Sequence, residues 1–129
     1  MTSLLSPLGG EFVTERHLAT LSTFAKDESL HVVPVGFTLE GDLARVIASG
    51  TSQKVLNIRR DARATICQVE GRNWVTLVGT AEILEERDDV ARAVELYSGR
   101  YKAPRENPLR VAIALTITRV MGSPGMLAG

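Results

Sequence analysis

A chain of 129 residues with 44% hydrophobic and 23% charged side chains has the composition of a folded protein, which excludes a disordered one. Fifteen basic residues balance fifteen acidic ones, so no overall positive field exists to attract nucleic acid. No apolar run approaches the roughly twenty residues of a membrane-spanning helix, and the start of the chain lacks the basic flank of a signal peptide. We therefore expect a single cytoplasmic domain, residues 1–129, that binds neither nucleic acid nor a membrane.

The first part of the chain predicts an N-terminal arm, residues 1–14, followed by strands. Pro7 and two glycines argue against a long helix here and leave room for a short one at residues 11–16. Pro34 cannot donate a ladder hydrogen bond, so its strand is predicted to lie at a sheet edge or to be bulged. From apolar alternation and β-branched content, strands are expected at residues 17–24, 31–39 and 43–49.

The stretch of residues 49–60 combines a glycine, hydroxyl side chains and a lysine at the expected start of a helix. The first amides of a helix have no intrahelical partner and attract anions, so a phosphate fits the amides of Gly50, Thr51 and Ser52. Lys54 would add a full charge. The alternative is an ordinary helix capped by Thr51 or Ser52, which the stretch taken alone favours. The sequence contains neither a Walker A loop nor a G-x-G-x-x-G motif.

The second half of the chain predicts a hairpin, a helix and a last strand. Within the second hairpin arm, Gly79 marks the close approach of another backbone or a ligand. Small residues on the outer face of the last strand indicate that both of its faces are covered, and a second subunit is the expected cover. The elements are expected at residues 63–69 and 73–84 for the hairpin, 87–101 for the helix and 109–120 for the strand.

These elements predict a mainly β, α+β fold in which six antiparallel strands close into a small barrel with a few helices. Two histidines and the single Cys67 do not form a metal site of usual spacing, so no metal is expected, and a lone cysteine fits a reducing cytoplasm. No side chain stands out as catalytic. Trp74, at the start of the long hairpin arm, either fills a subunit interface or forms a wall beside a planar ligand.

Three segments carry a resemblance to a known family. They are HVVPVGF at residues 31–37, SGTSQK with NIRRDAR between residues 49 and 63, and WVTLVGTA at residues 74–81. In this order and spacing they resemble the pyridoxamine 5'-phosphate oxidase-like split β-barrel family, over about residues 17–123. Residues 31–33 and the segment YKAPRENP, residues 101–108, resemble the F420-dependent branch, especially its biliverdin reductases.

The resemblance implies a split barrel of the FMN-binding type that forms a homodimer, with sites for coenzyme F420 between the subunits. Ala62 departs from the proline common at this position of the family, a harmless change. The cofactor contacts that the resemblance implies are with the phosphate (Ser49, Thr51, Ser52 and Lys54), along the phosphate and acidic tail (Asn57 and Arg59) and beside the ring (Pro34, Val35 and Trp74 of either subunit).

The activity implied by the resemblance is hydride transfer from the reduced deazaflavin to a conjugated acceptor, with biliverdin to bilirubin as the leading reaction. Two alternatives stay open: an FMN-dependent oxidoreductase of the same fold, and a non-catalytic protein that binds the cofactor or a tetrapyrrole. The tail, residues 124–129, lacks the C-terminal arginine-containing motif of true pyridoxamine phosphate oxidases, so that activity is disfavoured.

Overall fold

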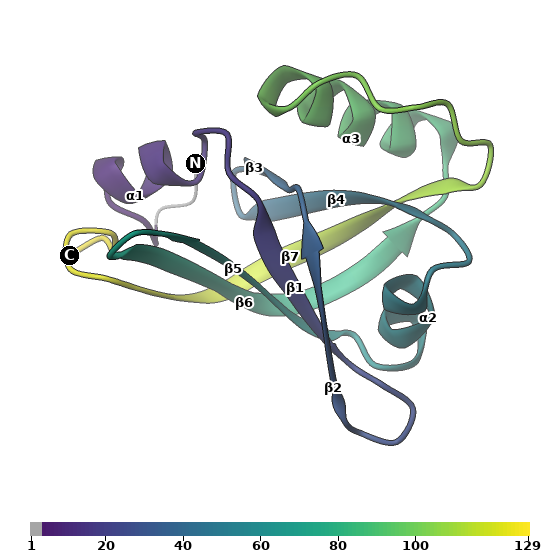
Figure 1. Ribbon diagram of the computed structural model, residues 1–129, viewed down its shortest axis with the longest axis horizontal. Helices are drawn as coiled ribbons and strands as arrows, with labels where there is room; N and C mark the ends of the chain where they lie inside the picture. The colour runs from purple at the N-terminus through teal and green to yellow at the C-terminus, as the bar shows by residue number, and fades with distance from the viewer. Residues whose placement is uncertain (1–3) are drawn as a thin grey trace.

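The computed structural model describes residues 4–129, so the first three residues of the predicted arm lie outside the described residues. One strongly curved antiparallel sheet forms the body of the protein, with the helices around it (Figure 1). None of the helices in residues 4–129 is long and apolar enough to cross a membrane. The helices are α1 (Pro7–Phe12), α2 (Gln53–Arg60) and α3 (Arg87–Arg100). The strands are β1 (Ala19–Phe24), β2 (Leu30–Val35), β3 (Thr38–Glu40), β4 (Leu43–Ser49), β5 (Arg63–Glu70), β6 (Asn73–Leu84) and β7 (Arg110–Gly122).

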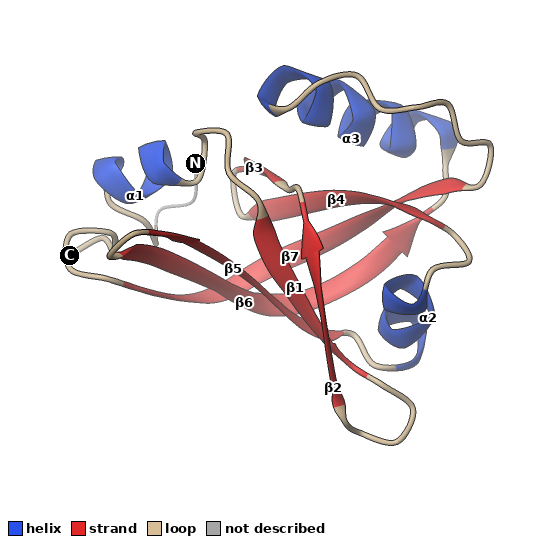
Figure 2. Cartoon of the chain, in the orientation of Figure 1, coloured by secondary structure: helices blue, strands red, loops and turns tan. Residues whose placement is uncertain are grey.

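The sheet closes because two strands adjacent in the sequence lie at its opposite ends. Its order is β2-β1-β5-β6-β7-β4-β3, and Gly36 and Phe37 alone separate β2 from β3. The sheet therefore has to curl until its edges approach each other, as Figure 2 shows. The predicted antiparallel barrel is confirmed, with seven strands in place of six. Pro34 lies on an edge strand, as predicted, because β2 pairs with β1 and ends the sheet.

The extra strand arises because the expected strand at residues 31–39 is broken at Gly36. A Cβ at Gly36 would lie 2.9 Å from a ring carbon of Tyr101, so the ring packs directly on the glycine backbone. The Phe37 N–H donates to the Tyr101 hydroxyl at 3.2 Å. Val35 and Phe37 are both buried in the same core, so the apolar alternation continues across the break and hides it in the sequence.

At Gly79 the backbone of β7 passes very close to β6. A Cβ there would lie 1.8 Å from the carbonyl oxygen of Thr116, and the pairing register shifts between Val78 and Gly79. The prediction that this glycine marks the close approach of another backbone is confirmed. On the same face of β6, Val75 and Leu77 are buried in the barrel interior.

The outer face of β7 is covered differently from the expectation. Ala112 and Ala114 are 0% and 1% exposed, and α3 packs against β4 and β7 with its buried Ala93. The expectation that a second subunit covers this face is therefore wrong for these two alanines, because α3 covers them. Further along the strand Thr116 and Thr118 are exposed, so this part of the outer face is open in the single chain.

The short N-terminal helix α1 begins earlier than the predicted residues 11–16. The Ser6 side chain accepts a hydrogen bond from the Gly9 N–H at 3.0 Å, and Pro7 follows it at the start of the helix. Gly9 fits tightly, because a Cβ there would lie 2.1 Å from the carbonyl oxygen of Met126. The predicted arm and tail therefore lie side by side (Figure 1).

Replacing Gly79 with alanine tests the close contact between β6 and β7. We expect Gly79→Ala to lower the free energy of unfolding by about 2 to 3 kcal/mol, because the new methyl group must displace backbone. Gly99→Ala is the control: no atom lies within 4 Å of a Cβ at that helical position, so it should be neutral or slightly stabilising. Urea unfolding measures both, and equal stability of the two variants would contradict the contact.

Candidate functional site

The turn between β4 and α2 uses two of the three amides that were expected to hold a phosphate. The Gly50 N–H donates to the Leu109 carbonyl at 2.8 Å, and the Ser52 N–H donates to the Ser49 carbonyl at 3.0 Å. The Ser52 hydroxyl donates to the same Ser49 carbonyl at 2.8 Å. The expected phosphate contacts with the Gly50 and Ser52 amides are therefore wrong, because both groups already stabilise the turn.

The start of α2 is nevertheless open. Ser52 has the extended conformation of an N-cap residue, but its side chain accepts no hydrogen bond from the helix. The Leu56 N–H donates to the Ser52 carbonyl, so the amides of Gln53, Lys54 and Val55 precede the helical hydrogen bonds. The expected alternative, a helix capped by a Ser52 or Thr51 side chain, is not what the structure has. The positive end of the helix dipole is left for an anion.

Lys54 lies at this open helix start and is partly buried. Burial lowers the pKa of its ammonium group, because the charged form loses water. Among residues 4–129, no carboxylate or hydrogen-bond acceptor pairs with it. Nearby, the Ser49 and Thr51 hydroxyl oxygens lie 3.4 Å apart. A desolvated cation beside open amides is the local chemistry that a phosphate stabilises.

Asn57, expected along the cofactor phosphate and tail, is fully buried with 0% exposure. Its Nδ2 donates to the Thr23 hydroxyl at 3.1 Å, and its Oδ1 accepts from Gln53 at 2.8 Å and from Arg60 at 3.2 Å. Asn57 is therefore not placed to contact a cofactor directly, because its side chain is buried and already hydrogen-bonded. What Asn57 does is hold α2 against β1.

The other residues expected at the site differ in exposure and in their partners. Arg59 is exposed near the end of α2 and forms an ion pair with Glu85. Pro34 is exposed on β2, whereas the Val35 side chain is 7% exposed and belongs to the barrel core. Ser49, Thr51, Ser52 and Lys54 thus lie within one short stretch between β4 and α2, whereas Pro34 and Val35 belong to the edge strand β2.

Trp74 is at the other end of the molecule within one chain. Its backbone exchanges hydrogen bonds with Ser123, just after β7, whereas Ser49 pairs with Arg110 at the first residue of β7. A strand of 13 residues such as β7 extends roughly 40 Å. Trp74, which is 37% exposed, therefore does not share a site with Lys54 in a single chain.

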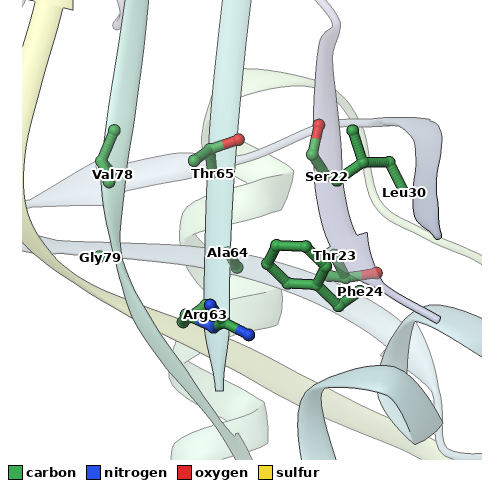
Figure 3. Close-up of a pocket in the computed structure, with 9 residues that line it drawn as sticks. All are labelled: Ser22, Thr23, Phe24, Leu30, Arg63, Ala64, Thr65, Val78 and Gly79. Carbon is green, nitrogen blue, oxygen red and sulfur yellow. The ribbon is translucent and has the colours of Figure 1, made fainter. Parts of the chain in front are cut away.

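An apolar pocket that no sequence pattern indicated lies on the outer face of β1, β5 and β6. Its volume is about 220 Å³, and Phe24, Arg63 and Val78 are among its lining residues (Figure 3). The Arg63 guanidinium lies 4.4 Å from the centroid of the Phe24 ring. Arg63 also donates to both carboxylate oxygens of Asp61, and these hydrogen bonds lower the pKa of Asp61 to about 2. The arginine beside the pocket is thus fixed on two sides.

The chain is similar to proteins of a known family. The family model described as pyridoxamine 5'-phosphate oxidase matches residues 10–122. The chain belongs to this family. A protein of Mycobacterium tuberculosis (strain CDC 1551 / Oshkosh) named F420H(2)-dependent biliverdin reductase is 44% identical to this family member over 128 residues. The match covers 98% of this chain and 93% of that protein.

Solved structures share the fold of this family member. A conserved hypothetical protein of Mycobacterium tuberculosis has a TM-score of 0.81 at 23% identity, covering 93% of this chain and 86% of that one. HutZ, a heme storage protein of Vibrio cholerae, has a TM-score of 0.76 at 15% identity, with 92% and 94% covered. At these identities the likeness concerns the fold alone.

Replacing Asn57 tests its structural role. We expect Asn57→Ala to lower the free energy of unfolding by about 1 to 3 kcal/mol, because the buried Thr23 hydroxyl loses its partner and α2 loses its anchor. The control Leu56→Gln changes a 46% exposed side chain of the same helix that makes no hydrogen bond to Asn57, and it should change stability by less than about 1 kcal/mol. Thermal or urea unfolding compares the two, and a neutral Asn57→Ala variant would contradict the anchoring role.

Proposed function

We propose that this family member is an F420-dependent oxidoreductase that reduces a conjugated acceptor, with biliverdin to bilirubin as the leading reaction. The observation that carries the proposal is the unpaired, partly buried Lys54 at the open start of α2, which suits a phosphate-bearing cofactor. The 44% identity with the biliverdin reductase of Mycobacterium tuberculosis supports F420 as that cofactor and a tetrapyrrole as the acceptor. We also propose a cytoplasmic location, in keeping with the single, unpaired Cys67.

In this proposal Lys54 and the first amides of α2 bind the cofactor phosphate, with Ser49 and Thr51 hydroxyls as further donors. Pro34 and Val35 lie beside the deazaflavin ring. When bound, the reduced deazaflavin supplies the hydride equivalent. The chain's own contribution is to bind the phosphate, to orient the ring along β2 and to exclude water. We assign no side chain as the proton donor.

Three residues act around this contact set. Ser52 shapes the turn through its hydrogen bonds to the Ser49 carbonyl. Asn57 fixes α2 from behind. Arg59 reaches the acidic tail of the cofactor by exchanging Glu85 for a carboxylate of the ligand.

We further propose a homodimer in which Trp74 of one copy completes the site that Lys54 of the other begins. Two observations support it: the two residues are separated by the length of β7 within one chain, and the outer sheet face is open at Thr116 and Thr118. Tryptophan is enriched at protein interfaces. A twofold dimer gives two equivalent sites, since the same surface serves both copies.

Replacing Lys54 tests the cofactor site. We expect Lys54→Ala to weaken F420 binding by about 1.5 to 3 kcal/mol, because a charge-assisted hydrogen bond to phosphate is lost. Lys26→Ala, which removes an exposed lysine in the β1–β2 turn, is the matched control. Fluorescence titration of F420 measures both, and an unchanged affinity in Lys54→Ala would remove the phosphate role.

The purified wild-type protein separates the F420-dependent reductase from the two alternatives, an FMN-dependent oxidoreductase and a non-catalytic binding protein. Protein that is yellow as purified, or that binds FMN more tightly than F420, would replace the cofactor while leaving the role of Lys54 intact. Oxidation of reduced F420 in the presence of biliverdin at steady state supports the proposed reaction. Binding of both compounds without turnover would make the protein a binding module.

Mixed dimers test the shared site. Lys54→Ala and Trp74→Ala should each reduce cofactor-dependent activity, because each removes one half of every site. Co-expressed, they should form mixed dimers in which one site has both mutations and the other has none, restoring about a quarter of the wild-type sites. Activity of the affinity-purified mixture measures this. No recovery in mixed dimers of confirmed composition would contradict a site built from two copies.

A further inference from the structure

A second pocket lies at the C-terminal end of α3, away from the open start of α2. Its volume is about 230 Å³, and it lies between the α3 end and the segment that enters β1. The residues that line it are Arg16, His17, Leu18, Tyr97, Tyr101 and Lys102. Two tyrosines and two cations thus surround one small hollow.

The two tyrosine rings form an aromatic wall of the pocket and are tilted relative to each other. Their centroids are 4.8 Å apart at an interplanar angle of 33°. The Tyr101 hydroxyl donates to the His17 carbonyl at 2.7 Å and accepts the Phe37 N–H, so its ring cannot rotate away. Burial raises the pKa of Tyr101 above its ordinary value, so this hydroxyl remains a donor at neutral pH, as an exposed tyrosine would.

This wall adjoins the edge strand that the proposed function assigns to the deazaflavin ring. A Cβ at Gly36 would lie 2.9 Å from the Tyr101 ring and 3.0 Å from the Tyr97 ring. Gly36 directly follows Val35, the last residue of β2. A ligand on the tyrosines would therefore lie beside the end of β2.

Two cations that line the pocket are available to a ligand. Within residues 4–129, neither Arg16 nor Lys102 forms an ion pair or a side-chain hydrogen bond, and both are exposed. The carboxylates of Glu15 and Glu70 lie on His17, each 3.5 Å from one of its ring nitrogens, and not on Arg16 or Lys102. The rim thus offers two free cations beside an aromatic surface.

We propose that this pocket binds the acceptor and selects for a planar, conjugated molecule that bears carboxylates. The conjugated system lies against Tyr97 and Tyr101, and Arg16 and Lys102 bind its carboxylates. This inference rests on the proposed function, because the neighbouring strand is the one assigned to the ring of the cofactor. A linear tetrapyrrole with two propionates meets the requirement, whereas an uncharged quinone meets only the aromatic half of it.

Charge-removing variants test the selection for carboxylates. Biliverdin and its dimethyl ester, which has the same conjugated system without the carboxylate charges, are titrated into protein without F420, and the absorption of the bilin is followed. We expect Arg16→Gln and Lys102→Gln each to weaken biliverdin binding about three- to fivefold, with the dimethyl ester unaffected. KM for biliverdin should rise by the same factor at constant kcat. Arg87→Gln, at the other end of α3, is the control and should change neither ligand.

The outcomes separate the pocket from the proposed function. If the wild-type protein neither binds nor reduces biliverdin, the proposed acceptor is wrong and the pocket assignment is wrong with it. If the wild-type protein reduces biliverdin and the double variant, with Arg16→Gln and Lys102→Gln combined, keeps its affinity and KM, the pocket assignment alone is overturned. Equal loss of biliverdin and its ester in the double variant also overturns it, because recognition would not depend on the carboxylates.

Tyr97→Leu tests the aromatic half of the pocket separately. It should weaken both ligands by a similar factor, because both present the same conjugated face. Tyr97 is preferable to Tyr101, whose hydroxyl holds backbone groups of the barrel. Unchanged binding of both ligands in Tyr97→Leu would remove the tyrosines from the site.

Discussion

The backbone at Gly36 and Phe37 is the point on which the barrel depends, because the chain there crosses from one edge of the sheet to the other. The end of α3 holds this crossing through Tyr101 and through Arg100, which donates to the Phe37 carbonyl. Arg100 also donates to the Glu15 carbonyl and to Gln68 Oε1. Burial lowers the pKa of Arg100, and neutral oxygens surround its charge. One side chain thus ties the N-terminal segment, the barrel and α3 together.

At α2, the residue that holds the helix in place differs from the groups that stay open to a ligand. The buried Asn57 fixes the helix through Thr23 on β1, while the first turn stays free of side-chain caps. A helix end held in this way loses little entropy when it binds an anion, because the donors are already oriented. Lys54 adds charge at a site whose geometry is set elsewhere. In the proposed function, stability and ligand contact therefore reside in different residues of one short helix.

Much of the fold was predictable because alternation with a period of two reports which side chains face the barrel, and that signal is local. The break of the strand at Gly36 was not predicted, since it depends on Tyr101, which is far away in the sequence. At the candidate site, the helix start and Lys54 were read from local order. The occupied amide of Gly50 was not, because its partner is the distant Leu109. The separation of Trp74 from Lys54 likewise follows from strand register, which no local pattern encodes.

The strand order also governs how the protein folds. β7 comes last among the strands but lies between β6 and β4 in the sheet, and Leu43 on β4 pairs with the distant Thr116. Pairings between distant segments form slowly, because loop closure costs entropy before any contact compensates for it. Before β7 is in place, β3 and β4 have no connection through hydrogen bonds to the remaining strands. A chain still under synthesis therefore has two partial sheets with open edges, the form in which strands pair with the wrong neighbour.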